Sequence, residues 1–353
     1  SRIASSNIEK ILKNLGFQVK RGKNKKWIVE VPGFRHDIER EIDLVEEVCR
    51  FYGYDKVKTT LPSLGSWEEK EDKKEKIKNV LRAILKGCGF YEVITNSLVG
   101  EELLRISGCF KEEQVYIRNP LSLEQKILRS YLFPQLLDVA SFNYNQEIKN
   151  LRIMEIGKVF KKKKDAFEEK MALAGVVVEK GFDFFSLKGI VEAILEEIQI
   201  DNVAFTFHSL PYFLSQESAF LEKNEMKLGY LGRLNPQLCE EFKLPCETYF
   251  FELDLDLILS FYEGKRYYQP LPKFPPVRRD ISVVIKENVT AAQVKDVVFK
   301  KGKYIEEIRF FDVYRGANIP SGHKSLSFSI IFRHPHKTLT DDEVNKIQSI
   351  IIK

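Results

Sequence analysis

The sequence of 353 residues predicts an α+β chain whose sheets are mainly antiparallel. Three observations predict this fold class. Residues 1–63 contain a helix, a hairpin and a second helix, the pattern of a small winged-helix-like module. Residues 64–270 contain long strands and helices without regular βαβ alternation. Residues 271–353 contain strand, helix, strand, strand and helix, a ferredoxin-like split that lacks its last strand. We therefore expect three domains with these boundaries.

The expected first domain has recognisable start and stop signals. Ser6 and Glu9 have the spacing of a capping box, and Gly16 is expected to end the helix that follows. Turn-forming residues at 21–24 separate two alternating stretches, which predicts the hairpin. Asp37 stands where the N-cap of the second helix is expected. The apolar stripe predicted for that helix is Ile38, Ile42, Val45, Cys49 and Tyr52.

The middle region alternates helical and strand patterns. Its helices are expected over 67–86, 125–143 and 186–200, and its strands over 90–99, 151–160, 171–178, 226–231 and 248–253. Four consecutive lysines, Lys161 to Lys164, stand at the expected tip of a hairpin. A short linker is expected around 61–65.

The clearest domain boundary is a run of eight residues, 269–276, that contains four prolines. Proline lacks a backbone N–H, so such a run continues neither a helix nor a central strand. The elements expected after it are strands over 280–285, 304–314 and 324–332 and helices over 291–299 and 340–351.

Charge is unevenly distributed along the chain, although the net charge is only +5. Residues 1–63 have a net charge of +4 and residues 271–353 of +6, while the middle has −5. Basic ends are compatible with a nucleic-acid partner. A few excess lysines are equally typical of a solvated surface, so charge alone leaves both readings open.

Several classes of protein are excluded by their missing motifs. The sequence has no GxGxxG loop, P-loop, HExxH pair or GxSxG elbow. It has no apolar run of the roughly 18 residues that a membrane span needs. Its cysteines form no CxxC pair, which favours a reducing cytoplasm over a disulfide framework. These cysteines are Cys49, Cys88, Cys109, Cys239 and Cys246.

One acidic group could bind a cation. It consists of Asp37, Asp43, Glu46 and Glu47. The last three fall on one face of the predicted helix, away from its apolar stripe. Ligands that are all oxygen favour Mg²⁺ or Ca²⁺. The alternative is a solvated face paired with Arg40 and Arg50, in which Asp37 is only a cap.

Three groups of motifs follow one another along the chain. They are VPGFRHDI at 31–38, NPLS at 119–122 with MEIGKVF at 154–160, and FPPVRRD at 274–280 with FDVY at 311–314. Together they resemble the C-terminal part of the bacterial phenylalanyl-tRNA synthetase beta chain, over nearly the whole chain. The resemblance implies a class II synthetase-like module at 64–270 and a ferredoxin-fold anticodon-binding domain at 271–353.

The resemblance implies the following sites. The four carboxylates would belong to a magnesium site shared with the alpha chain. No catalytic residue is expected here, because the family's active site lies on the alpha chain. Arg152 and Arg233 only superficially resemble the ATP-binding arginines of class II enzymes, so ATP is expected to be used by the holoenzyme and not bound by this chain. A structural pair of Arg152 with Glu155 is the simpler expectation.

The resemblance also implies partners. Asp312 and Tyr314 are expected to meet the anticodon of phenylalanine tRNA, with Arg278 and Arg279 on phosphates unless one of them pairs with Asp280. The chain would scaffold the alpha chain in a cytoplasmic heterotetramer of two alpha and two beta chains. Two alternatives remain: a stand-alone nucleic-acid-binding or assembly protein that reuses these domains, and an independent ATP-using ligase.

Overall fold

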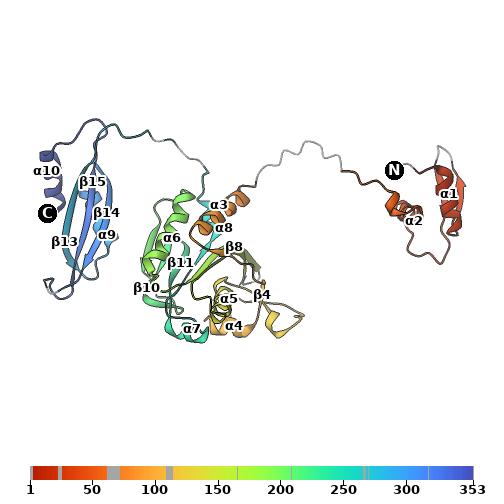
Figure 1. Ribbon diagram of the computed structural model, residues 1–353, viewed down its shortest axis with the longest axis horizontal. Helices are drawn as coiled ribbons and strands as arrows, with labels where there is room; N and C mark the ends of the chain where they lie inside the picture. The colour runs from red at the N-terminus through yellow and green to blue at the C-terminus, as the bar shows by residue number, and fades with distance from the viewer. Residues whose placement is uncertain are drawn as a thin grey trace. The chain divides into compact units, whose positions relative to one another are not determined.

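The computed structural model describes most of the chain (Figure 1), namely residues 3–22, 26–61, 72–108, 114–164, 166–207, 209–264, 268, 270–316 and 318–352. The chain divides into two compact units, Ser1–Gly87 and Cys88–Lys353. The expected linker at 61–65, the start of the charged helix at 67, the centre of the turn at 21–24 and Cys109 lie wholly or partly outside the described residues.

The first unit contains two helices around a hairpin, and one further helix. Its elements are α1 (Ser5–Asn14), β1 (Gln18–Arg21), β2 (Trp27–Glu30), α2 (Glu41–Tyr52), the 3-10 helix η2 (Tyr54–Lys56) and α3 (Lys73–Gly87). The hairpin is confirmed, because β1 pairs antiparallel with β2. Gly16 follows α1 with φ +89°, a left-handed conformation that favours glycine, so the predicted stop is also confirmed.

Both predicted helix starts in this unit were wrong. The N-cap of α1 is Ala4, with no side-chain hydrogen bond, so the Ser6–Glu9 capping box does not form. Helix α2 begins at Glu41, four residues after Asp37. Asp43 caps it from inside the first turn, where its Oδ2 accepts hydrogen bonds from the backbone N–H groups of Glu39 and Arg40 at 2.9 and 2.7 Å.

The expected apolar stripe of α2 is also rotated. Ile42 is 60% exposed and Val45 48% exposed, whereas Val48 is 6% exposed. The small core consists of Leu12, Phe17 and Val48, with Leu44 and the hairpin packed against it. Two stripes on α2 have helical spacing, and contact with α1 and the hairpin selects the one through Leu44 and Val48.

The second unit contains one large sheet and one small one within its described residues. The large sheet has the order β3-β7-β8-β12-β11-β10-β9, antiparallel except for the parallel pair β3–β7. Its strands are β3 (Tyr91–Glu92), β7 (Leu151–Lys163), β8 (Ala166–Val178), β9 (Ala204–Phe207), β10 (Phe213–Lys223), β11 (Met226–Leu234) and β12 (Thr248–Asp254). We call it the seven-stranded sheet. The small sheet is formed by β4 (Leu98–Val99), β5 (Val115–Tyr116) and β6 (Ile127–Leu128).

Helices and aromatic side chains complete this region. The helices are α4 (Glu101–Ile106), η4 (Leu123–Gln125), α5 (Phe133–Asn145), α6 (Phe184–Glu197), α7 (Pro236–Glu241) and α8 (Leu255–Ser260). The ring of Phe250 on β12 stacks on Phe133 and Phe213, with centroid separations of 4.7 and 4.5 Å. These contacts join α5 to the seven-stranded sheet.

Two sequence predictions in this region were wrong. The strand expected over 90–99 is two short strands that belong to different sheets. The helix expected over 125–143 starts only at Phe133, with Pro134 in its first turn, where the missing N–H costs no helical hydrogen bond. The strands β9 and β10 and the helices α4, α7 and α8 were not predicted.

The C-terminal part has the predicted order of elements. These are β13 (Val277–Lys286), α9 (Ala291–Lys301), β14 (Ile305–Tyr314), β15 (His323–Phe332) and α10 (Asp341–Ile352). The strands form an antiparallel sheet in the order β13-β15-β14, around the buried Phe328, Ile330 and Phe332. No helix in the described part of the whole chain has both the length and the hydropathy to cross a membrane.

Candidate functional site

The expected pairing of Arg152 with Glu155 was wrong. Arg152 on β7 forms an ion pair of 2.7 Å with Glu179 and donates a hydrogen bond of 2.8 Å to the backbone carbonyl of Cys88. Arg152 therefore connects β7 to the segment before β3 and to the end of β8. Its guanidinium is already used within the chain.

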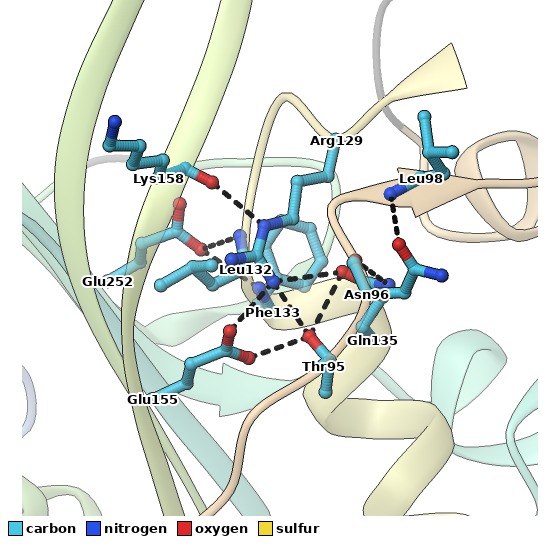
Figure 2. A network of polar contacts seen from close by, with 10 residues as sticks. All are labelled: Thr95, Asn96, Leu98, Arg129, Leu132, Phe133, Gln135, Glu155, Lys158 and Glu252. Atoms are coloured by element: carbon cyan, nitrogen blue, oxygen red, sulfur yellow. Dashed lines mark hydrogen bonds and ion pairs between the residues drawn. The ribbon is translucent and has the colours of Figure 1, made fainter. Parts of the chain in front are cut away.

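Glu155 instead pairs with Arg129 in a buried polar network (Figure 2). The two side chains are 2% and 4% exposed, and the atoms Arg129 Nη1 and Glu155 Oε1 are 2.8 Å apart. The Thr95 hydroxyl accepts a hydrogen bond of 2.7 Å from Arg129 Nη1 and donates one of 2.7 Å to Glu155 Oε2. Arg129 Nε also donates to the carbonyl of Lys158 at 2.8 Å. Every member has a partner, as a buried ion pair requires.

Gly157 makes room for this network. A β-carbon at position 157 would lie 2.3 Å from Arg129 Nη2 and 2.9 Å from Glu155 Oε1. Only glycine lets the guanidinium approach the strand so closely. The sequence showed Glu155 and Gly157 within the motif at 154–160, but nothing in the spacing predicted that Arg129 meets them.

Glu252 on β12 stabilises the start of α5 (Figure 2). Its Oε2 accepts hydrogen bonds of 3.0 Å from the backbone N–H groups of both Leu132 and Phe133. Burial raises the pKa of this carboxyl to about 7, although the two N–H donors oppose the shift. Glu252 is 119 residues away from Phe133 in the chain, so sequence reasoning missed this contact.

Arg233 on β11 is likewise paired within the chain. Its Nη1 lies 3.1 Å from Glu217 Oε1, and its Nε donates to the carbonyl of Cys246 at 2.7 Å. Glu217 also accepts a weaker hydrogen bond of 3.4 Å from the hydroxyl of Tyr249. Arg233, like Arg152, is therefore held by a carboxylate and a backbone carbonyl of this chain.

The acidic group of the first unit is held largely by arginines. Arg35 donates to both oxygens of Asp37, at 3.0 and 2.7 Å, and lowers the pKa of that carboxyl to about 2. Glu47, 8% exposed, lies between Arg50 at 2.8 Å and Arg35 at 3.2 Å. Arg50, then Arg35, lowers the pKa of Glu47. Both carboxylates are therefore ionised at neutral pH.

The remaining two members of this group differ from each other. Asp43 accepts the two backbone hydrogen bonds at the start of α2, and these lower its pKa. The carboxylate of Glu46 is exposed and has no hydrogen bond or ion pair with any described residue. Within the described chain, no three His, Cys, Asp or Glu side chains are placed to hold a metal ion. Its own carboxylates therefore do not assemble a complete ligand set.

The two candidate phosphate-binding arginines lie on opposite faces of β13, because neighbouring residues of a strand alternate. Arg278 Nε lies 3.1 Å from Asp280 and 2.7 Å from the Ser329 hydroxyl. Pairing of one arginine with Asp280 was an expected alternative. Arg279 pairs with Asp341 in the first turn of α10. Arg278 is therefore on the face away from the helices, and Arg279 is on the helix side.

Asp312 and Tyr314 share the helix-free face of the C-terminal sheet. A β-bulge after Phe310 brings Asp312 opposite Ser327 and Tyr314 opposite Ser325. Phe310 itself packs against Phe328 in the core. Without the bulge, Asp312 would share the core-facing side of Phe310, since one residue of register flips every side chain. Both residues are exposed, and Tyr314 is 49% exposed.

Comparison with known protein families identifies the family of this chain. A model described as the phenylalanyl tRNA synthetase beta chain CLM domain matches residues 57–255, which is more than half of the chain. The chain belongs to the phenylalanyl-tRNA synthetase beta-chain family. Two further models match, the tRNA synthetase B5 domain over residues 1–54 and the ferredoxin-fold anticodon-binding domain over residues 272–353.

Relatives of this beta chain support the same family. The beta subunit of phenylalanine–tRNA ligase from Thermotoga maritima is 32% identical over 96% of this chain and 44% of its own length. Those from Bacillus licheniformis and Bacillus subtilis are each 34% identical over 99% of this chain and 45% of theirs. The chain thus spans less than half the length of these relatives. A pyrrolysyl-tRNA synthetase from Desulfitobacterium hafniense is a structural neighbour, with 17% identity, a TM-score of 0.46, and coverage of 54% of this chain and 70% of its own.

Proposed function

We propose that this chain is the part of a phenylalanine–tRNA ligase beta subunit that scaffolds the catalytic alpha chain and binds the anticodon of phenylalanine tRNA. ATP-dependent phenylalanyl-tRNA formation then belongs to a complete cytoplasmic enzyme of two alpha and two beta chains. One observation carries the proposal. The segment that matches an anticodon-binding domain presents Asp312 and Tyr314, exposed, on the helix-free face of its sheet.

The chemistry of this face suits unpaired RNA bases. An exposed tyrosine ring provides a stacking surface for a base, and an exposed carboxylate accepts hydrogen bonds from a guanine edge. The carboxylate of Asp312 has no hydrogen bond or ion pair with any described residue, so its lone pairs are available. Arg278, on the same face, is the better candidate for a phosphate contact, because its side chain is 67% exposed although it pairs with Asp280, whereas that of Arg279 is 28% exposed. Arg279 would first have to leave Asp341.

The chain itself is proposed to be non-catalytic and to bind no ATP. The two arginines in question, Arg152 and Arg233, are each held by a carboxylate and a backbone carbonyl of this chain. Recruiting either to a phosphate would leave a partly buried carboxylate without its partner. The paired arginines therefore support a structural role.

Exposed apolar side chains support a scaffolding role for the second unit. Several lie in the segment before α5 and on α5 itself, where Ile94 is 90% exposed, Leu121 94% and Phe142 67%. Contiguous exposed apolar surface is typical of protein interfaces. We propose that the alpha chain covers them. We also propose the three domains 1–63, winged-helix-like, 64–270, class II synthetase-like, and 271–353, anticodon-binding.

Asp37, Asp43, Glu46 and Glu47 are proposed to contribute to a magnesium site that only the alpha chain completes. Their ionised oxygens suit Mg²⁺. In the chain by itself, however, Arg35, Arg50 and the start of α2 already use three of them. Glu46 is the member best placed to accept a metal from a partner, because it is exposed and has no described partner.

Reconstitution tests the main proposal. The intact beta chain and the alpha chain would be purified separately and mixed, and phenylalanine-dependent pyrophosphate exchange and tRNA charging would be measured. We expect charging only in the mixture, and no exchange by the beta chain alone. Exchange by the beta chain alone would contradict the non-catalytic role, and charging by the alpha chain alone at the mixture's rate would contradict scaffolding.

A single substitution tests the metal proposal. Glu46→Gln removes a charge without disturbing the cap or the arginine pairs, and should weaken magnesium-dependent association of the two chains. Glu41→Gln, at another exposed acid of α2, is the matched control and should leave association unchanged. Equal association of both variants at every magnesium concentration would leave only the solvated-face interpretation.

A further inference from the structure

Half of the β7–β8 hairpin extends beyond its sheet. The two strands pair along their whole length, from Leu151 opposite Val178 to Lys163 opposite Ala166. Strand β12 pairs with β8 only over residues 172–178, and β3 pairs with β7 only at 153–154. Residues 158–164 and 166–171 therefore form a two-stranded arm with no further strand on either side among the described residues, and only its base is held, where Phe160 N–H donates to the Arg129 carbonyl at 2.8 Å and Met171 N–H to Asp256 at 2.7 Å.

The arm is basic, and its two faces differ. Residues 158–170 contain six lysines and three acids, a net charge of +3. One face holds its lysines: Lys163 pairs with Glu168 at 2.7 Å, and Lys161 lies 3.0 Å from the Tyr131 hydroxyl. Lys162, on the other face, and Lys164, in the turn at the tip, are exposed and have no ion pair with any described carboxylate, whereas Lys158, on the face of Lys162, pairs with Glu169 at 2.5 Å.

An exposed aromatic ring lies on the same face as Lys162, next to the turn that holds Lys164. Phe167 is directly opposite Lys162 in the antiparallel pair, so the two side chains point to the same side of the arm. Phe167 is 72% exposed. Nothing in the described chain covers this ring. An exposed aromatic ring beside unpaired lysine ammonium groups matches the chemistry of nucleotides, because a nucleotide combines a base that can stack with a phosphate.

We propose that the tip of this arm, Lys162, Lys164 and Phe167, is a second RNA-binding surface of the chain, separate from the C-terminal sheet. The lysines contact backbone phosphates, and Phe167 stacks on an unpaired base. The net positive charge of the arm is unsuited to a basic or purely apolar partner. This inference rests on the proposed function, because it takes tRNA as the RNA that the assembled enzyme brings to the arm.

Binding of tRNA to the assembled enzyme tests the proposal. Lys162→Gln with Lys164→Gln should weaken binding of phenylalanine tRNA about tenfold at about 50 mM salt. This deficit should shrink about tenfold by about 200 mM salt, because each lost phosphate contact also removes released counterions. The matched control, Lys180→Gln with Lys243→Gln, removes the same charge from exposed positions elsewhere in the second unit and should bind like the parent.

Substitutions of Phe167 separate stacking from simple apolar contact. Phe167→Leu should lose about tenfold in affinity and Phe167→Tyr should keep it, because only an aromatic face stacks on a base. Equal binding by the leucine variant would overturn the stacking role.

Three outcomes separate a failure of this inference from a failure of the proposed function. If the lysine variants bind tRNA like the parent, the arm is not an RNA surface while the proposed function stands. If they lose association with the alpha chain and keep tRNA affinity, the arm is a protein contact and the inference is wrong. If the parent enzyme does not prefer phenylalanine tRNA over other tRNAs, the proposed function itself fails.

Discussion

The charged side chains of the seven-stranded sheet are more deeply buried than those on the helix-free face of the C-terminal sheet. In the first, Arg129, Arg152 and Arg233 are each paired with a carboxylate of the chain. In the second, Arg278 pairs with Asp280 but both side chains are more than half exposed, and Asp312 and Tyr314 are exposed on the same face. The buried cation Arg129 resists recruitment by a ligand most strongly, because Glu155 would remain buried and unpaired, whereas Arg152 and Arg233 are only partly buried. The difference indicates that one sheet maintains structure while the other is open for binding.

The largest expected effect is loss of the buried pair in the seven-stranded sheet. Arg129→Met leaves Glu155 buried without its partner and should lower the free energy of unfolding by about 3–5 kcal/mol. The double variant Arg129→Met with Glu155→Leu should recover part of this loss. Urea unfolding would measure both. A double variant as unstable as the sum of two single variants would contradict the pairing.

Glu252 should make stability depend on pH. Its pKa is raised from 4.5 to about 7 in the folded chain, so its favourable contribution is complete below pH 4.5 and is lost as the pH rises to about 7. The loss amounts to about 3 kcal/mol. In Glu252→Gln this part of the pH dependence should disappear. Identical slopes of unfolding free energy against pH in both proteins would contradict the assignment.

Gly316 offers a subtler change at the open sheet. A β-carbon there would lie 2.1 Å from the Tyr314 hydroxyl oxygen, so Gly316→Ala must move the ring. We expect tRNA binding by the assembled enzyme to weaken by about 1 kcal/mol, the lower end of a stacking contribution, while folding is unchanged. Gly322→Ala is a poor control because that glycine has φ +75°; Gly33→Ala, which meets nothing within 4 Å, is the matched one. Unchanged tRNA affinity in Gly316→Ala would remove Tyr314 from the interface.

The smallest effect should come from the ion pair of Arg278 with Asp280. Because both side chains are more than half exposed, Arg278→Gln should change the free energy of unfolding by less than about 1 kcal/mol. Thermal or urea unfolding would check this. A loss of unfolding free energy as large as that of Arg129→Met would mean that the ion pairs of the two sheets do not differ in their contribution to stability.

The C-terminal fold could be predicted from the sequence because its signals are local. The proline-rich boundary, alternating strands and periodic helices gave every element of the described part within a few residues. Between residues 88 and 132, by contrast, strands of two residues carry too little periodicity to be recognised. The position of β3 depends on a partner far away in the chain, because Tyr91 lies opposite Ile153 of β7.

The candidate sites show the same limit. Their residue types could be named from motifs, but their partners could not. Arg35 lies two residues before Asp37, yet only the fold brings it also to Glu47. The stripe of α2 was misassigned because Ile42 and Val45 have the right helical spacing, and spacing does not say which stripe α1 covers. For Asp312, a bulge that no sequence pattern indicated decides the face.

The central claim is that the C-terminal sheet binds the anticodon. The most direct test measures the affinity of the assembled enzyme for phenylalanine tRNA and for the same tRNA with one anticodon guanine replaced. We predict that the parent discriminates between them, and that Asp312→Asn and Tyr314→Ala lose most of this discrimination while pyrophosphate exchange is unchanged. Full discrimination retained by both variants would contradict the account.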